Sequence, residues 1–311
     1  MKVKLFSHID LDGYGCNYIC KNAYQIDNLD CENLSYDNCD IAIKHFFTSG
    51  EYKNYNELII TDLSIKEDTA ALIDRYLKNA KGLKVHYCDH HKSSLYANKY
   101  EWAVINEEIY GKETCATEIF FEICSDVLKS KCNNTKLSNI EEIVYFITLY
   151  DTWRWKTEEE CGEYAVQLND LLYLLGAEEF INQLMKKNFM DLINDNKALL
   201  DFRKRDIAEY INRKEKEIIP FKICNYTAGI VFADRYLSQL GDILGERHPE
   251  YDLIAMITSN SVSYRTKKDN VDCCELAAKF GGGGHPQSSG NPIDINVIET
   301  YLKNIFKESD E

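Results

Sequence analysis

Short apolar runs alternate with helical periodicity along the first third of the chain. Four runs bounded by polar residues predict strands over residues 2–7, 40–44, 57–61 and 83–88. Between them, residues 14–24 and 65–81 have apolar positions three and four apart, which is typical of amphipathic helices. Strands that alternate with helices predict a parallel sheet with helices on both faces.

The remaining pattern predicts further helices and then a second sheet. Helical spacing covers residues 112–129, 137–150, 178–187 and 191–217, and we interpret the last of these as a connecting helix. Residues 221–233 and 252–265 predict strands or hairpins around a helix at 235–247, and a final helix covers 295–306. We therefore predict an α/β protein made of a domain at 1–188, a connecting segment at 189–219 and a smaller α/β domain at 220–311.

Composition and charge narrow the class of partner. The 311 residues suit two domains of ~100–200 residues each. Hydrophobic residues make up 45% and charged residues 28%, which indicates a globular protein. The net charge of −15 argues against long duplex nucleic acid and against an anionic membrane surface, because both require a dense basic footprint. Any nucleic acid that binds should be short and single-stranded.

The cysteines suggest a compartment. The chain has twelve cysteines with no C-x-x-C pair, so their spacing does not suit a zinc ribbon. The first ten residues turn polar too early for a secretion signal, and no apolar run approaches the ~20 residues of a membrane span. We expect a cytoplasmic protein with reduced thiols.

Acidic and imidazole side chains gather where the predicted strands end. They follow three strands far apart in the sequence: His8, Asp10 and Asp12, then Asp62, then Asp89, His90 and His91. Parallel strands end at the same edge, which is where open α/β sheets bind ligands. Because several carboxylates in a small volume repel one another, a divalent cation is expected among them. The mixture of Asp and His suits Mn²⁺ or a similar ion better than calcium.

These segments resemble the motifs of a known family. His8-Ile-Asp-Leu-Asp-Gly13, Asp62-Leu-Ser64, Asp89-His90-His91 and Asp151 in Tyr150-Asp-Thr-Trp153 resemble the four motifs of the DHH phosphoesterases. Ser263-Tyr-Arg265-Thr and the Gly281-Gly-Gly-Gly-His285 run resemble the C-terminal DHHA1 domain of that family. The resemblance implies a DHH domain followed by a DHHA1 domain. Length and layout are similar to the oligoribonuclease (nanoRNase) and pAp-phosphatase branch.

The resemblance also implies a role for each matching residue. It implies two divalent cations, Mn²⁺ before Mg²⁺, one held by His8, Asp10 and Asp62 and the other by Asp12, Asp62, His90 and Asp151. Asp89 would orient a ligand histidine, and His91 would contact the scissile phosphate or assist the leaving oxygen. Substrate binding is implied for residues of the C-terminal domain: Ser263, Arg265, Gly282, Gly283, Gly284 and His285.

The glycine run has two interpretations. Glycines let backbone N–H groups approach an anion, which predicts a phosphate cradle, and the alternative is a flexible turn. The neighbouring Arg265 and His285 favour the cradle, because both can contact a phosphate. We expect a cleft between the domains to hold a short nucleotide.

The predicted function is Mn²⁺-dependent hydrolysis of short RNA or DNA to nucleoside monophosphates by a two-metal exonuclease mechanism. The alternatives are a pAp phosphatase or a phosphodiesterase for linear or cyclic dinucleotides. A non-catalytic nucleotide-binding module is a distant third, because such a protein should lack several ligands. The choice between RNA and DNA, the polarity of cleavage and the oligomeric state stay open at this point.

Two features near the motifs have plainer interpretations. Trp153 and Trp155 follow Asp151 closely and could stack on a base, but we expect them to pack in the core or at a hinge. Cys88 precedes Asp89 in a predicted strand and is expected to be a buried strand residue rather than a nucleophile.

Overall fold

The computed structural model describes residues 2–24, 26–78, 82–158 and 161–306. The chain forms two compact units, Met1–Leu200 and Asp201–Glu311. Within the described ranges, no helix combines the length and the apolar character needed to cross a membrane.

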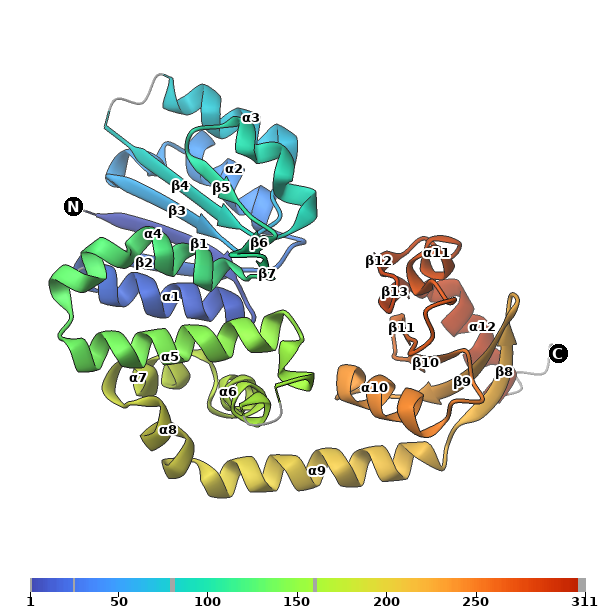
Figure 1. Ribbon diagram of the computed structural model, residues 1–311. Coiled ribbons are helices and arrows are strands. Elements are labelled where there is room, and N and C mark those ends of the chain that lie inside the picture. The colour runs from blue at the N-terminus through green and yellow to red at the C-terminus, as the bar shows by residue number, and fades with distance from the viewer. Residues whose placement is uncertain (1, 25, 79–81, 159–160, 307–311) are drawn as a thin grey trace. The chain divides into compact units, whose positions relative to one another are not determined.

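A five-stranded parallel sheet is the centre of the N-terminal unit (Figure 1). Its strand order is β2-β1-β3-β4-β5. The strands are β1 (Val3–His8), β2 (Leu29–Leu34), β3 (Glu57–Thr61), β4 (Lys84–Asp89) and β5 (Ala103–Ile105). Ser7 pairs with Thr61 and Thr61 pairs with Cys88, so the three central strands end together at one edge.

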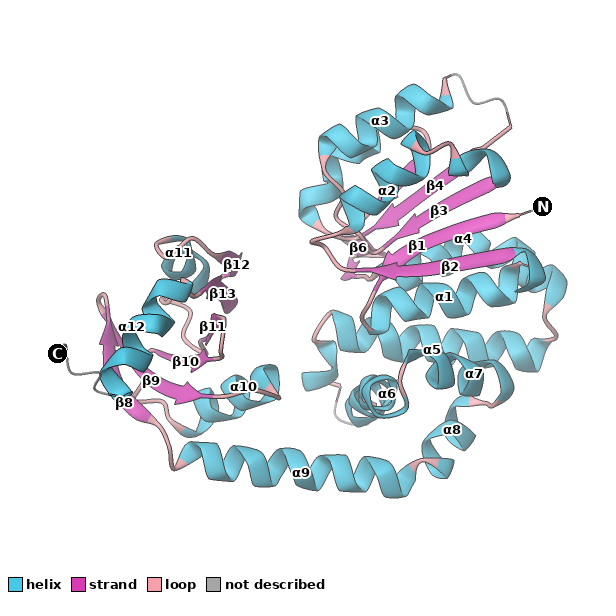
Figure 2. Cartoon of the chain, turned by 180° about the vertical axis from the view of Figure 1, so that it is seen from behind, coloured by secondary structure: helices cyan, strands magenta, loops and turns pink. Residues whose placement is uncertain are grey.

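Helices cover both faces of this sheet, as Figure 2 shows. One face packs against α2 (Cys39–Thr48) and α3 (Glu67–Leu77), and the other packs against α1 (Leu11–Ala23) and α4 (Ala116–Lys131). Helix α5 (Asn134–Asp151) packs on α1 and α4 in the next layer. Side chains alternate along β3: Leu58 and Ile60 belong to the first core, and Ile59 belongs to the second. The predicted α/β class and helix-covered parallel sheet are confirmed.

The predicted strand over residues 40–44 is wrong, and β2 was missed. Residues 40–44 lie in helix α2, whose buried Cys39, Ile43, Phe46 and Phe47 have helical spacing that a five-residue window does not reveal. Strand β2 lies at the edge of the sheet, and of its six residues only Leu34 is fully buried. An edge strand therefore carries too few apolar positions to stand out in the sequence.

The rest of the N-terminal unit is mainly helical. It contains α6 (Gly162–Leu175), α7 (Ala177–Lys186), α8 (Phe189–Asp195), the strands β6 (Glu108–Ile109) and β7 (Lys112–Glu113), and short 3-10 helices at Ile26–Asn28, Glu51–Asn54, Lys92–Lys99 and Arg154–Lys156. The single helix expected over 191–217 is two helices, α8 and α9 (Lys197–Glu215). Asn196 separates them, because its side-chain amide donates to the carbonyl of Leu192.

The C-terminal unit is built on a six-stranded sheet of order β12-β13-β11-β10-β9-β8. Its strands are β8 (Ile219–Ile223), β9 (Tyr226–Phe232), β10 (Leu253–Ile257), β11 (Ser261–Arg265), β12 (Gly283–His285) and β13 (Ser288–Pro292). Its helices are α10 (Leu237–Arg247), α11 (Cys273–Ala278) and α12 (Ile295–Phe306). Strands β9 and β10 are parallel and the other neighbours are antiparallel. The cores around α10 and α11 lie on opposite sides of β10, because Met256 belongs to the first and Ala255 to the second.

Candidate metal centre

The side chains that follow β1 and β3 meet at the shared edge of the sheet. His8 Nδ1 lies 2.8 Å from Asp10 Oδ2 and 3.7 Å from Asp62 Oδ2. One ligand-type atom from each of these three residues lies within 4.8 Å of the others. This is the geometry expected of the first predicted ligand group.

A second group lies beside the first. His90 Nε2 is 3.4 Å from Asp151 Oδ2 and 3.9 Å from Asp12 Oδ2. It is also 3.7 Å from Asp62 Oδ1, so Asp62 lies close to both groups. Asp151 is the last residue of α5, and Asp12 belongs to the first turn of α1. The fold therefore brings all six predicted ligands together from four separate segments.

The backbone at this edge of the sheet positions the side chains of Asp10 and Asp62. Asp10 is the N-cap of α1, and its Oδ1 accepts a 3.0 Å hydrogen bond from the N–H of Gly13. A Cβ atom on Gly13 would lie 2.1 Å from the carbonyl oxygen of His8, so only glycine fits there. Asp62 has a φ of 54°, in the left-handed region that costs a non-glycine residue energy and that clusters at functional sites. The turn that projects the Asp62 carboxylate is thus a strained one.

Asp12 is held by a helix distant in sequence. Its Oδ2 accepts from the N–H of Ala116 at 2.8 Å, and its Oδ1 accepts from the N–H of Thr117 at 2.7 Å. Thr117 also donates its hydroxyl to the backbone oxygen of Asp12 at 2.6 Å. These bonds place Asp12 at the N-terminus of α4, where the helix dipole stabilises its negative charge. Sequence reasoning missed this contact.

Asp89 is fully buried and orients His91. Its Oδ1 lies 2.7 Å from His91 Nδ1 and accepts from the N–H of His90 at 2.8 Å. Its Oδ2 accepts from Ser94 at 2.5 Å and from Tyr87 at 3.1 Å. The sequence led us to expect that Asp89 orients a ligand histidine, and in the structure the ring that it contacts is that of His91.

Tyr36 is a residue of the site that sequence reasoning missed. Its ring stacks on His8 with centroids 4.2 Å apart, and its hydroxyl lies 3.1 Å from His91 Nε2. Tyr36 lies two residues beyond the end of β2, at the same edge as the ligands. Recognition of β2 as a strand was the signal that could have located it.

Burial and mutual repulsion act on the carboxylates of this cluster. Burial, followed by the charges of neighbouring aspartates, raises the pKa of both Asp62 and Asp151 well above the usual range. Burial also acts to raise the pKa of Asp10, but the contact with His8 and the N–H of Gly13 outweigh it and lower that pKa to about 2. Burial acts to lower the pKa of His91, but the hydrogen bond that its Nδ1 donates to Asp89 raises that pKa, and the net shift is upward.

Three buried polar atoms in the cluster have no hydrogen-bond partner: His8 Nδ1, Asp62 Oδ2 and Asp151 Oδ2. Although His8 Nδ1 is near Asp10, the two groups are not in hydrogen-bond geometry. Buried polar atoms are rarely left unsatisfied in native proteins. Oxygen and imidazole donors that face one small volume fit divalent cations such as Mn²⁺.

The two tryptophans near Asp151 differ in how deeply they are buried. Of the two expected positions, core or hinge, the core is excluded for Trp153, which is 47% exposed and has Lys156 Nζ 4.7 Å from its ring centre. Its φ of 59° turns the chain sharply after α5, which keeps the side chain out of the core. Trp155 is partly buried against the main core. Cys88 is buried, and burial raises the pKa of its thiol, as suits a strand residue rather than a nucleophile.

The predicted substrate residues lie on strands β11 and β12 of the C-terminal unit, with Gly282 just before β12, and β13 lies between the two strands. Arg265 pairs with Ser288, and Ser288 pairs with His285. One step along, Ser263 pairs with Gly290, and Gly290 pairs with Gly283. Directly opposed residues of antiparallel strands point to the same face, so Ser263, Arg265 and His285 share one face of the sheet.

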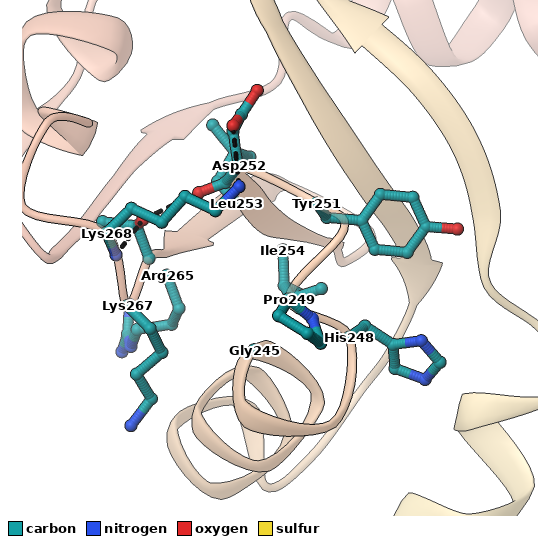
Figure 3. A pocket seen from close by; sticks show the side chains of 11 residues that line it. Gly245, His248, Pro249, Tyr251, Asp252, Leu253, Ile254, Arg265, Lys267 and Lys268 are labelled. Atoms are coloured by element: carbon teal, nitrogen blue, oxygen red, sulfur yellow. Dashed lines mark hydrogen bonds and ion pairs between the residues drawn. The ribbon is translucent and has the colours of Figure 1, made fainter.

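Arg265 is more enclosed than the sequence suggests. Its Nη1 donates to the backbone oxygen of Tyr264 at 2.9 Å, its Nη2 donates to Ser238 at 3.3 Å, and its buried Nε has no partner. Arg265 lines a pocket of about 160 Å³ (Figure 3). The two lysines of the pocket are already neutralised, Lys267 by Asp242 and Glu246 and Lys268 by Asp252. The other predicted substrate residues do not line this pocket.

The glycine run is not an open cradle of four N–H groups. The N–H groups of Gly281 and Gly282 donate to the carbonyls of Ala278 and Ala277, at the end of α11. Gly283 and Gly284 then belong to the edge strand β12. A Cβ on Gly282 would lie 2.0 Å from the carbonyl oxygen of Gly290, so the glycine permits a close approach of two strands.

Comparisons with known proteins agree with this architecture. The oligoribonuclease NrnB of Bacillus subtilis is 32% identical over 97% of this chain and 76% of its own length. A 3′,5′-cyclic-nucleotide phosphodiesterase of Helicobacter pylori is 25% identical over 94% of this chain and 93% of its own length. The exonuclease RecJ, solved with bound manganese, matches with a TM-score of 0.59 at 11% identity, over 97% of this chain and 88% of its own. No family model matches the sequence.

Proposed function

Because this chain belongs to the DHH/DHHA1 phosphoesterase family, in its oligoribonuclease branch, we propose that it is a metal-dependent hydrolase of short single-stranded oligonucleotides, which it cuts to nucleoside monophosphates. The observation that carries this proposal is the cluster at the edge of the parallel sheet, where six acidic and imidazole side chains converge and three buried polar atoms have no partner.

The proposed ligand sets follow the two groups in the cluster. His8, Asp10 and Asp62 would hold one cation, and Asp12, Asp62, His90 and Asp151 would hold the other, with Asp62 shared. The mixed nitrogen and oxygen donors support Mn²⁺, with Mg²⁺ second. When bound, two such cations neutralise charge that develops on the phosphate and lower the pKa of an attacking water.

The remaining residues of the site would orient the reacting groups. The buried carboxylate of Asp89 fixes the ring of His91, which leaves Nε2 facing outward towards Tyr36. We assign His91 to the scissile phosphate or the leaving oxygen, since a fixed imidazole can donate a proton there. In the C-terminal unit, Arg265, His285, Ser263 and Gly282–Gly284 would bind a phosphate or a terminal base.

The preference for short substrates rests on charge. A net charge of −15 and the absence of a long basic run leave no track for an extended phosphate backbone. We place the activity in the cytoplasm, because the twelve cysteines are free and most of them are buried.

The cyclic-nucleotide phosphodiesterase relative favours a second candidate function. The same cluster could act on pAp or on a linear or cyclic dinucleotide, because all of these present a phosphate ester to the same ligands. The two candidates differ in substrate rather than in chemistry.

A product time course separates these possibilities. RNA and DNA of two to twenty nucleotides, labelled at either end, would be incubated with Mn²⁺, with pAp and cyclic nucleotides alongside. We expect hydrolysis that a chelator abolishes and Mn²⁺ restores, with kcat/KM falling steeply from dinucleotides to 20-mers. Full turnover in chelator would refute the metal-dependent mechanism, and equal kcat/KM at all lengths would refute the preference for short substrates.

A further inference from the structure

Tyr36 connects two imidazole rings of the candidate metal centre. Its ring lies nearly parallel to that of His8, at an interplanar angle of 27°, and meets the ring of His91 edge-on at 82°. Its hydroxyl is the hydrogen-bond partner of His91 Nε2 at 3.1 Å. With 43% of the residue exposed, Tyr36 borders solvent as well as the cluster, so an incoming substrate can reach it.

The turn that carries Tyr36 is fixed on both sides. Before it, the Asn33 side chain donates to the carbonyl oxygen of His8 at 2.5 Å, which ties the end of β2 to the ligand loop. After it, Asn38 Oδ1 accepts from the N–H of Ser35 at 2.9 Å, and Cys39 Sγ donates to the carbonyl oxygen of Tyr36 at 3.5 Å. Tyr36 therefore occupies a built position and not a free loop.

Each ring nitrogen of His91 has one partner. Asp89 accepts hydrogen bonds from its neighbours, so it accepts the Nδ1 proton of His91. In the neutral ring Nε2 accepts from the Tyr36 hydroxyl, and in the protonated ring, the form that can donate to a leaving oxygen, Nε2 donates to that hydroxyl. Asp89 and Tyr36 thus fix the His91 ring from opposite sides, and a substrate oxygen that approaches Nε2 must share or replace the Tyr36 hydroxyl.

The second contact concerns His8. Stacking on Tyr36 restricts rotation of the His8 ring, whose Nδ1 faces Asp10 and Asp62. A restricted ring loses less entropy when it binds a cation. The hydroxyl and the ring of Tyr36 therefore act on different residues.

We propose that Tyr36 is a positioning residue with two separable roles: its hydroxyl sets His91 for the reaction, and its ring sets His8 for cation binding. This inference rests on the proposed hydrolytic function. It predicts that Phe at position 36 preserves the second role and removes the first.

The first test is kinetic. Tyr36→Phe should lower kcat on a labelled dinucleotide roughly tenfold, with KM changed less than threefold. In a His91→Ala background the same substitution should cause no further loss, because the hydroxyl acts through that ring. A wild-type kcat for Tyr36→Phe, or an equal loss in both backgrounds, would overturn the role of the hydroxyl.

The second test measures cation binding without turnover. Titration of Mn²⁺, followed by the electron paramagnetic resonance of free Mn²⁺, should give wild-type affinity for Tyr36→Phe and roughly tenfold weaker affinity for Tyr36→Ala. Equal weakening by the two substitutions, or none by Tyr36→Ala, would overturn the role of the ring. Tyr24→Phe is the matched control, because its hydroxyl bonds to Glu57 at the opposite end of β3.

A third measurement is independent of the substrate. Nitrogen chemical shifts of the His91 ring, measured in chelator, should change in Tyr36→Phe and stay unchanged in Tyr24→Phe, and an unchanged His91 signal in Tyr36→Phe would overturn the hydrogen bond. If the wild-type protein hydrolyses no oligonucleotide while these shifts change as expected, the proposed function fails and the contact with His91 stands.

Discussion

The two units present their candidate residues in opposite ways. In the N-terminal unit, Asp12, Asp62 and Asp89 are at most 1% exposed and lie at the ends of parallel strands or in the adjoining helix. In the C-terminal unit, Gly283, Gly284 and His285 form an exposed strand at the edge of a mostly antiparallel sheet. The first arrangement fixes anions in place before any ligand arrives, and the second leaves the backbone and side chains of β12 accessible, although Arg265 on β11 is enclosed.

The difference matches what the proposed ligand of each unit would require. A divalent cation is small and requires donors at set positions, which burial and hydrogen bonds such as those of Asp12 and Asp89 provide. A nucleotide is large and variable, so its contacts can remain at the surface. The comparison predicts that substitutions in the first unit affect cation binding and that substitutions in the second affect KM.

The largest effect is expected from Asp62→Asn. Removing the carboxylate shared by both ligand groups should lower kcat/KM by roughly 10³-fold or more, since cation stabilisation is worth several kcal/mol. In chelator, the same variant should be at least as stable as the wild type, because a buried charge near other carboxylates is gone. Steady-state kinetics and urea unfolding in chelator measure the two quantities.

Asp68→Asn is the matched control for that experiment. Asp68 lies in the same unit, is exposed and pairs with Lys44. It should retain wild-type activity. An Asp62→Asn enzyme within tenfold of the wild type would show that the buried cluster is not the catalytic centre.

An intermediate effect is expected in the C-terminal unit. Arg265→Gln and His285→Ala should each raise KM and lower kcat/KM by roughly 10- to 150-fold, the cost of a charge-assisted phosphate contact of ~1.5–3 kcal/mol. The affinity for Mn²⁺ should not change. Kinetics on a labelled dinucleotide and a Mn²⁺ titration test both statements.

Arg247→Gln serves as the control, because Arg247 is a surface residue of the same unit that pairs with Glu215. Weakened cation binding in the Arg265 or His285 variant would contradict the division of roles between the units.

The smallest effect is expected from Glu57→Gln, on the free energy of unfolding and its dependence on pH. Burial acts to raise the pKa of Glu57, but hydrogen bonds from His86 and Tyr24 outweigh it and lower that pKa. A carboxyl whose pKa is lower in the folded state stabilises fully above its unfolded pKa, and this stabilisation is lost as pH falls through the folded pKa. Glu57→Gln should therefore cost about 1 kcal/mol at neutral pH and progressively less below pH ~4.3.

Tryptophan fluorescence can follow this transition, because Trp102, Trp153 and Trp155 all lie in the N-terminal unit. Chelator in every sample removes the contribution of bound cations. A difference between Glu57→Gln and the wild type that grows towards acid pH would refute the assigned sign.

The sequence alone predicts much of the parallel sheet and of the cluster at its edge. Strands β1, β3 and β4 are short, largely apolar runs, and His8 and Asp89 end two of them while Asp62 follows the third, so one pattern predicts both the sheet and the cluster at its edge. Strand β2 was not predicted, because an edge strand needs few apolar residues. Tyr36, which follows this strand, was therefore not predicted as a residue of the site. One missed strand thus concealed one residue of the site.

Other features depend on contacts that no local pattern encodes. Asp12 reaches the N–H groups of Ala116 and Thr117, more than a hundred residues along the chain. The enclosure of Arg265 depends on helix α10, where a Cβ on Gly241 would lie 2.6 Å from Arg265 Cγ. Such pairings appear only after distant elements have packed.

Because Asp12 caps α4, the restriction on which residue can begin this helix applies to position 12 and not to position 115. Helices usually begin with Ser, Thr, Asp or Asn, and α4 begins after Cys115, whose side chain caps nothing. Position 115 is therefore free of the usual requirement and can hold a buried thiol in contact with Thr148. Position 12 carries the constraint instead and must suit a helix and the candidate metal centre at once. Even a glutamate there, with the same charge and one more methylene, would have to satisfy both.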